Sequence, residues 1–260
     1  MTSSSLQTPT GSAAFQANTA GYVATMVPSL RRVAAEVVRR ADLQPDERVL
    51  DVGSGTGIAA SAALGEGRTV MGVDGAEAMI QVARRDVHGA TFEVMDFHNL
   101  GFDNASWDVV ISSHALLFAD DRVAALREWR RVVRPGGRLS LSVPGPGELT
   151  PSVIYGAIYE RWGIARGFDY PTAEELAAWG EAAGWGGIAT GADPEMAIRL
   201  PDDAAFAVWR NTGSRAGVTA HFTEEQHAAL TAEMLAITPR EPDGTLRIPF
   251  AALYLAATNG

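Results

Sequence analysis

Short apolar runs alternate with amphipathic runs through the first 143 residues of the chain. The apolar runs contain many β-branched residues, which is typical of strands buried on both faces of a sheet. The runs between them are rich in alanine and repeat their apolar residues at helical spacing. In chain order the runs are RVLDV, IAASAAL, RTVMGV, AEAMIQVARR, TFEVM, WDVVIS, RVAALREWRRVV and RLSLSV. This order predicts a doubly wound α/β fold with a parallel sheet, preceded by a helix over 28–40.

The pattern changes after residue 143, where aromatic residues and turn residues separate helical segments. Helices are expected from about 172, over 202–211 and over 223–237, and the run TLRIPFAALYLAAT alternates like one closing strand. The helix over 121–134 is expected to end at Pro135, Gly136 and Gly137. We therefore expect a disordered tail over 1–14, an α/β core over 15–143, a helical lid with a sixth strand over 144–245, and the closing strand of the core sheet over 246–260.

Composition excludes several classes of function. The 260 residues include no cysteine, which excludes disulfides, thiolate nucleophiles and cysteine-ligated metals. All 21 basic residues are arginines, so no lysine is available for a Schiff base or for a phosphate site of the Walker type. The formal charge of −10 predicts that the chain does not bind nucleic acid.

No apolar run approaches the roughly 18 residues that a membrane-spanning helix needs, so no membrane span is expected. The first residues lack the basic and apolar regions of a signal peptide, and we expect a cytoplasmic location. The sequence carries no signal for oligomeric state.

A glycine-rich turn follows the first predicted strand. In VLDVGSGTG, over 49–57, a buried strand leads into three alternate glycines, Gly53, Gly55 and Gly57. Glycine lacks a Cβ and tolerates positive φ, so such a turn lets a ligand lie close to the backbone. The following GTGIAA also satisfies a dinucleotide-binding pattern, so the glycines alone do not choose between cofactors.

Carboxylates at the ends of three successive strands distinguish between the two candidate cofactors, S-adenosylmethionine and a dinucleotide. Asp51 ends the first strand, Asp74 the second and Asp96 the third. S-adenosylmethionine presents an ammonium group, two ribose hydroxyls and an adenine amino group, all of which donate to carboxylates, and its sulfonium is cationic. A dinucleotide pyrophosphate would be repelled by Asp51 and Asp96, although Asp74 alone suits the ribose of either cofactor.

Five segments resemble, in order and spacing, the class I S-adenosylmethionine-dependent methyltransferases of the ubiquinone- and menaquinone-biosynthesis-like branch. They are VLDVGSGTG, GVDGAEAMI, VMDFHNLGF, WDVVISSHALLFADD and LREWRRVVRPGGRLSLSV. The resemblance covers about 45–145 and continues weakly to the end. It implies a mostly parallel seven-stranded sheet of the Rossmann-like methyltransferase fold with an inserted helical lid. It also implies S-adenosyl-L-methionine as cofactor and methyl transfer to O, N or C of a small organic acceptor.

The resemblance assigns binding roles to residues of these segments. It implies that Asp51, Gly53, Gly55 and Gly57 hold the methionine portion, Asp74 with the adjacent Gly75 the ribose, Asp96 and Phe97 the adenine, and that Ser112 and Ser113 belong to the loop beneath the sulfonium.

Positioning is the main task in such a reaction, because the sulfonium is already an activated leaving group. His114 follows the fourth strand and is the candidate general base for a phenol or alcohol acceptor, with a hydrogen-bonded pocket histidine as the alternative. His221 could reach the pocket from the lid, whereas His88 and His98 are expected at the surface. No spacing of histidines and acids indicates a metal site. Candidates for the acceptor pocket, or alternatively for core packing, are Tyr155, Tyr159, Trp162 and Trp209.

Two other functions stay open at this point. A nicotinamide-dependent oxidoreductase would lack the lysine of the Tyr/Lys pair and would place Asp51 and Asp96 against pyrophosphate. A non-catalytic S-adenosylmethionine-binding protein could share the same fold. The segment over 144–245 is expected to overhang the carboxyl ends of the strands and so to set acceptor choice.

Overall fold

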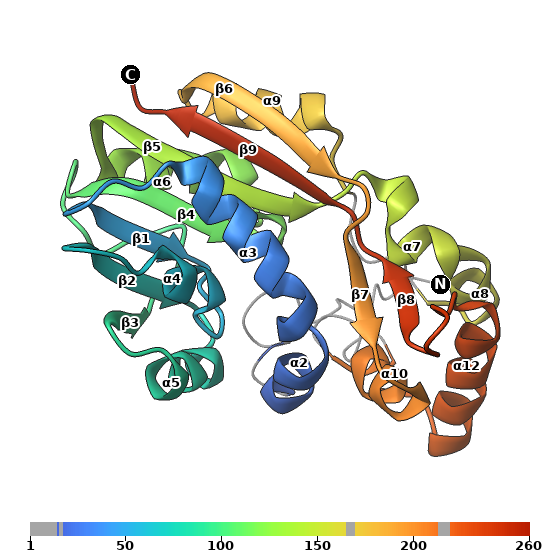
Figure 1. The fold of residues 1–260 in the computed structure, drawn as a ribbon. Helices are drawn as coiled ribbons and strands as arrows, with labels where there is room; N and C mark the ends of the chain where they lie inside the picture. Colours follow the sequence, from blue (N-terminus) through green and yellow to red (C-terminus); the bar gives the residue numbers. More distant parts are fainter. Residues whose placement is uncertain (1–14, 16–17, 165–169, 213–218) are drawn as a thin grey trace, which may run out of the picture.

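The structure is a computed structural model that describes residues 15, 18–164, 170–212 and 219–260. Its centre is a seven-stranded sheet in the order β3-β2-β1-β4-β5-β9-β6 (Figure 1). Strands β1 to β5 pair in parallel, whereas β9 is antiparallel to both β5 and β6. The predicted doubly wound, mostly parallel seven-stranded sheet is therefore confirmed. The tail predicted over 1–14 lies outside the described residues.

Each run expected to form a strand before residue 144 does so, and one helix covers the range expected over 28–40. The strands of the sheet are β1 (Arg48–Val52), β2 (Thr69–Asp74), β3 (Ala90–Val94), β4 (Trp107–Ser113), β5 (Val133–Pro144), β6 (Gly186–Asp193) and β9 (Ala252–Thr258). The helices beside it are α3 (Val27–Ala41), α4 (Ile58–Ala63), α5 (Glu77–Asp86), α6 (Arg122–Val132) and α9 (Ala173–Ala182), and α2 (Thr19–Thr25) precedes α3 and contacts it.

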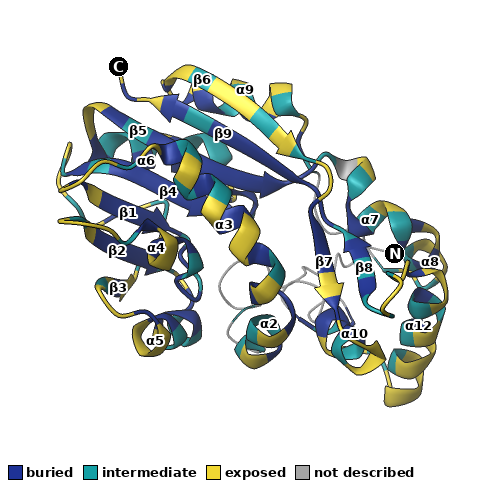
Figure 2. Ribbon diagram, viewed as in Figure 1, coloured by how far each residue is buried: buried dark blue, intermediate teal, exposed yellow. Residues whose placement is uncertain are grey.

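Both faces of the sheet are covered. Neighbouring residues of a strand point to opposite faces, so Val49 joins one apolar core and Leu50 the other. Residues of α3, α4 and α5 belong to the first core, and residues of α6 and α9 belong to the second. Figure 2 shows the central strands buried, while β6 at the sheet edge is largely exposed. Burial on both faces explains why the central strands read as continuous apolar runs.

Two predicted element boundaries are wrong. Helix α6 ends at Val132, and the Pro135–Gly137 turn lies inside β5, where Gly136 has a φ of +75°. The expected single closing strand is two strands, because β8 (Leu246–Pro249) pairs with β7 (Ala197–Leu200) while β9 joins the main sheet. Both strands carry the same alternation of apolar residues, so the pattern did not reveal the break at Phe250 and Ala251.

A second unit, which we call the cap, lies beside the sheet (Figure 1). It consists of β7, β8, α7 (Pro151–Ile154), α8 (Gly156–Arg161), α10 (Asp203–Arg210) and α12 (Glu224–Ile237). Its buried aromatic residues, including Tyr155 and Trp209, belong to the same apolar core as α3 and α4. The range predicted as a lid, 144–245, is thus divided, since its α9 and β6 are part of the main sheet layer. Among the described residues, none of the helices is long and apolar enough to cross a membrane.

A partly buried ion pair joins β5 to the turn before β1. Nη2 of Arg138 donates to both carboxylate oxygens of Glu47, at 2.8 and 2.7 Å, and Nε donates to the carbonyl of Ala41 at 2.9 Å. Glu47 is only 8% exposed and also accepts from the backbone N–H of Gln44. Because a buried carboxylate needs a compensating charge, Arg138 fixes how the chain passes from α3 into β1.

Replacement of Arg138 with methionine is expected to lower the free energy of unfolding by about 2–4 kcal/mol, because it leaves Glu47 buried without its cation. The control is Arg161→Met, which removes an exposed pair with Glu233 and should cost less than about 1 kcal/mol. Urea denaturation followed by tryptophan fluorescence measures both. Equal losses in the two variants would show that the Arg138–Glu47 pair does not hold this junction.

Candidate functional site

The turn between β1 and α4 has an unusual backbone. Gly53, Gly55 and Gly57 all have positive φ, at +70°, +52° and +80°, a region that residues with a Cβ rarely adopt. A Cβ on Gly53 would collide with the Cβ of Ala115, whereas a Cβ on Gly55 would meet nothing within 4 Å. The backbone at Gly55 therefore borders open space, as a ligand-binding turn requires.

Asp74, at the end of β2, holds this turn in place. One carboxylate oxygen accepts from the backbone N–H of Gly55 at 2.9 Å, and the other accepts from the N–H of Ala76 at 2.8 Å. The N–H groups of Gly53 and Ser54 donate to the carbonyl of Val73. Burial raises the pKa of Asp74, and the two N–H donors oppose that rise. Each carboxylate oxygen keeps a second lone pair for a ligand.

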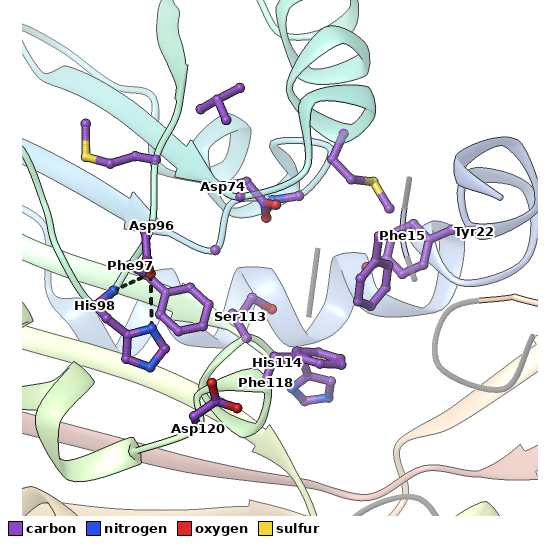
Figure 3. A pocket seen from close by; sticks show the side chains of 17 residues that line it. Phe15, Tyr22, Asp74, Asp96, Phe97, His98, Ser113, His114, Phe118 and Asp120 are labelled. Atoms are coloured by element: carbon purple, nitrogen blue, oxygen red, sulfur yellow. Dashed lines mark hydrogen bonds and ion pairs between the residues drawn. The ribbon is translucent and has the colours of Figure 1, made fainter. Parts of the chain in front are cut away.

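A cavity of about 520 Å³ opens beside the turn, at the carboxyl ends of the strands (Figure 3). This volume is within the usual range for small-molecule sites. Its lining residues all come from the first 120 residues and include eight of the predicted site residues: Gly53, Gly55, Asp74, Gly75, Asp96, Phe97, Ser113 and His114. The structure therefore brings most of the predicted site together around one space.

The charge of this cavity is negative. Asp74, Asp96 and Asp120 line it, and the described residues around it include no arginine. A carboxylate-lined cavity attracts a cationic ligand and repels a phosphate. Asp120, and not Asp51, is the third acid that lines this cavity.

Asp96 and its neighbours form one wall. The Asp96 carboxylate accepts from the backbone N–H of His98 at 2.9 Å and lies 3.0 Å from its Nδ1, and the hydrogen bond to this N–H lowers the pKa of Asp96 (Figure 3). The Phe97 ring packs beside the His98 imidazole, and the Phe97 carbonyl accepts from Nε1 of Trp129. His98, which was expected at the surface, has a half-buried ring that lines the cavity.

Three aromatic residues that sequence reasoning missed form another wall. Phe15 packs edge-to-face against both Tyr22 of α2 and Phe118, with ring centroids 5.6 and 5.1 Å apart. Phe118 ends the short 3₁₀ turn η1 (Leu116–Phe118), and all three side chains line the cavity. Phe15 and Tyr22 precede the first periodic segment of the chain, so neither spacing nor a motif marked them.

His114 lines the cavity in a strained and neutral form. Its φ of +58° is uncommon for a residue with a Cβ. Its Nδ1 lies 2.9 Å from Oγ of Ser142, and its buried Nε2 has no partner among the described residues. Burial lowers the pKa of His114 to about 3, despite a hydrogen bond with Ser142 that opposes the shift. The imidazole is therefore uncharged at neutral pH.

Three predicted binding residues do not line the cavity, and their direct contact with a ligand stays a prediction. Asp51 is fully buried and accepts from the N–H of Ala60 in α4 at 2.8 Å, and burial raises its pKa to about 7. Gly57 begins α4, where a Cβ would press on Phe92 and Val87. Ser112 donates its hydroxyl to the carbonyl of Val52. All three residues make internal contacts that support the turn.

The aromatic candidates from the cap lie elsewhere. Tyr155 and Trp209 are fully buried and pack together with Phe206, and neither they nor Tyr159 and Trp162 line this cavity. His221 is exposed and does not line it either. Among the described residues, no group of three or more histidine and acidic side chains is placed to hold a metal ion.

Part of the chain is similar in sequence to known proteins. Residues 50–141 match the family model described as a methyltransferase domain. Nocamycin O-methyltransferase of Saccharothrix syringae is 33% identical over 133 residues, covering 48% of this chain and 48% of its own length. Demethylmenaquinone methyltransferase of Beutenbergia cavernae is 37% identical over 96 residues, covering 37% of this chain and 40% of its own.

Among solved structures, phosphoethanolamine N-methyltransferase 2 of Haemonchus contortus in complex with S-adenosyl-L-methionine has a TM-score of 0.57. It is 20% identical and covers 87% of this chain and 52% of that chain, which shows a shared fold. The chain spans about half the length of the first curated relatives that it matches. Residues 50–141 therefore form a methyltransferase domain, and this part of the chain is similar in sequence to demethylmenaquinone methyltransferases among other methyltransferases.

Proposed function

We propose that this chain transfers a methyl group from S-adenosylmethionine to a small organic acceptor. The observation that carries the proposal is the acidic cavity beside a glycine turn whose backbone borders open space. Carboxylates in a cavity that no arginine lines favour a ligand that carries a sulfonium and an ammonium group. The same carboxylates disfavour the pyrophosphate of a nicotinamide cofactor.

The residues present fit this cofactor. Asp74 would accept from the ribose hydroxyls through its remaining lone pairs, with Gly75 beside it. Asp96 and Phe97 would hold the adenine, since they offer a carboxylate acceptor and an aromatic face at the same wall. Gly53 and Gly55 would let the methionine portion approach the backbone, and Ser113 has a buried hydroxyl without a partner among the described residues.

The bound cofactor supplies an electrophilic methyl group, so the protein needs chiefly to position the acceptor and exclude water. His114 is poorly suited to act as a general base, because a pKa of about 3 is far below the roughly 10 of a phenol. We infer that its neutral ring holds the acceptor through a hydrogen bond at Nε2. The strained backbone at His114 keeps the ring at the cavity wall.

The cap is the part of the chain that we assign to acceptor choice. Helix α10 leads into Asn211, whose carbonyl accepts from Nδ2 of Asn18 at 2.9 Å, directly before α2. Because α2 carries Tyr22 into the cavity wall, the cap is coupled to the cofactor site through this contact. A small organic acceptor, a cytoplasmic location and the lack of nucleic-acid binding stay predictions from the sequence.

Transfer itself is tested by incubating the protein with S-adenosylmethionine labelled in the methyl group and a pool of phenols, amines and carbon acids. The proposal expects label to appear in an acceptor together with released S-adenosylhomocysteine. Binding of the cofactor without transfer to any acceptor would favour a non-catalytic binding protein on the same fold.

Cofactor choice is tested by thermal denaturation. Saturating S-adenosylhomocysteine, at about 100 times its dissociation constant, should raise the midpoint by about 5–10 °C, because it binds only the folded state. NAD and NADP at the same concentration should leave the midpoint unchanged. A rise with NAD and none with S-adenosylhomocysteine would reverse the assignment.

The substitution Gly55→Val tests the open backbone of the turn. The new side chain would fill the space next to the backbone and strain a φ of +52°, so affinity for S-adenosylhomocysteine should fall at least about 100-fold. Gly163→Val is a matched control, since Gly163 has a φ of +65° and equally open surroundings but lies outside the cavity. Calorimetric titration should find its affinity unchanged. Equal losses in the two variants would indicate a general effect of strain.

The neutral state of His114 is tested by the pH dependence of stability. Between about pH 3 and 6.5 the unfolded chain binds a proton at this ring that the folded protein excludes, so wild-type stability falls as pH drops below 6.5. The His114→Gln variant should therefore lose about 2 kcal/mol less than wild type between pH 7.5 and 5.0. Urea denaturation at both pH values measures the difference, and the exposed His88→Gln should behave like wild type. A wild-type response from His114→Gln would mean that the ring accepts a proton freely.

A further inference from the structure

Arg210, the last residue of α10, places a guanidinium inside the cap. The residue is only 3% exposed. Its Nε donates to Oγ1 of Thr231 at 2.8 Å, and its Nη2 lies 2.7 Å from Nδ1 of His227, both on α12. The side chain thus links the two long helices of the cap.

The two partners of Arg210 are uncharged. A guanidinium can only donate, so Nδ1 of His227 must accept and carries no proton. Burial, with the charge of Arg210 as a further cause, lowers the pKa of His227. The Thr231 hydroxyl donates to the carbonyl of His227 at 2.7 Å, which leaves its lone pairs for Arg210. Neither partner therefore balances the positive charge.

The described residues provide no counterion for Arg210. Arg210 takes part in no ion pair within the described part of the chain, and its buried Nη1 has no hydrogen-bond partner there. Arg138, which is less buried than Arg210, holds the carboxylate of Glu47. A buried cation without an anion is costly, and the C-terminal end of α10 offsets this cost only in part. A buried guanidinium without an acidic partner in the protein is suited to bind the anionic group of a ligand.

The surroundings indicate which kind of anion fits. A single free Nη1 beside neutral groups suits one carboxylate, whereas a phosphate dianion commonly needs several charged or backbone donors. The Phe222 ring lies 5.8 Å from the His227 ring and 5.7 Å from the Trp162 ring, centroid to centroid. These aromatic faces suit the apolar body of an organic acid.

The position of Arg210 connects it to the cofactor cavity. The next two residues, Asn211 and Thr212, contact α2: Asn211 accepts from Asn18, and Thr212 packs against Gly21. Tyr22, the neighbour of Gly21, lines the cavity. Figure 1 shows α10 beside α2 on the side of the cap that faces the sheet.

We propose that Arg210 binds the carboxylate of an organic acid and that this acid is the methyl acceptor. The assignment of the acid as acceptor rests on the proposed methyltransferase function, whereas the carboxylate site itself does not. The free Nη1 of Arg210 donates to one carboxylate oxygen, while Thr231 and His227 hold the guanidinium in place. Trp162 and Phe222 contact the apolar part of the acid.

Benzoate is the probe for this site. We would measure thermal midpoints of wild type, Arg210→Gln and Arg240→Gln in benzoate, acetate, phosphate and chloride at equal ionic strength, with benzamide as the uncharged analogue. Glutamine keeps donors for Thr231 and His227 but removes the charge. Arg240 is the matched control, because its exposed guanidinium pairs with Asp203 at the other end of α10.

Benzoate is expected to raise the midpoint of wild type and Arg240→Gln saturably by about 2–4 °C relative to chloride, and to leave Arg210→Gln unchanged. Benzamide should have no effect. The proposal is overturned if benzoate and acetate leave wild type unchanged, if Arg210→Gln responds like wild type, or if phosphate alone stabilises.

Thermal midpoints of the same three proteins with S-adenosylhomocysteine distinguish the proposed carboxylate site from the proposed methyltransferase function. All three proteins should keep the cofactor-induced rise, because Arg210 does not line the cofactor cavity. A benzoate response without any cofactor response would leave the carboxylate site standing and would contradict the proposed methyltransferase function.

Discussion

The conformation of the turn between β1 and α4 depends on the hydrogen bond between the N–H of Gly55 and the carboxylate of Asp74. This bond joins the ends of two neighbouring parallel strands and holds a left-handed backbone that glycine alone adopts without strain. The second oxygen of Asp74 fixes the start of the next helix through Ala76. The open backbone of the turn and the start of α5 both depend on this one half-buried carboxylate, which also contributes to the acidic lining of the cavity.

The ionisable groups in and beneath the cavity are arranged to suit a cationic cofactor. Asp51 lies under the turn with a pKa raised to about 7, and His114 lies at the cavity wall with a pKa lowered to about 3, in both cases chiefly because water is excluded. Burial therefore favours the uncharged form of both groups, so that at neutral pH Asp51 is only partly ionised and His114 is neutral. The cavity keeps a negative character from Asp74, Asp96 and Asp120, which suits a cationic cofactor and leaves the acceptor side less charged. Arg210 supplies a positive charge on the cap side, where the proposed acceptor anion would bind.

The sequence predicted the sheet and its acidic edge because both rest on local rules. Buried parallel strands must read as apolar runs, and a turn with three positive φ angles must contain glycine, so β1 and Gly53, Gly55 and Gly57 were recognisable. Direct contact by Asp51 was not decidable, since the register of α4 places the N–H of Ala60 on that carboxylate. Phe15 and Tyr22 reach the cavity through tertiary packing, which leaves no periodic signal. Arg210 was equally hidden, because its burial depends on α12, which follows it in the chain.

The central claim is that the acidic cavity beside the glycine turn is the S-adenosylmethionine site. The most direct measurement is a crystal structure of the protein with S-adenosylhomocysteine. Our account predicts the ligand in the cavity, with ribose hydroxyls within hydrogen-bonding distance of the Asp74 carboxylate and the adenine against Phe97. A ligand bound elsewhere, or bound in the cavity with its ribose away from Asp74, would contradict it.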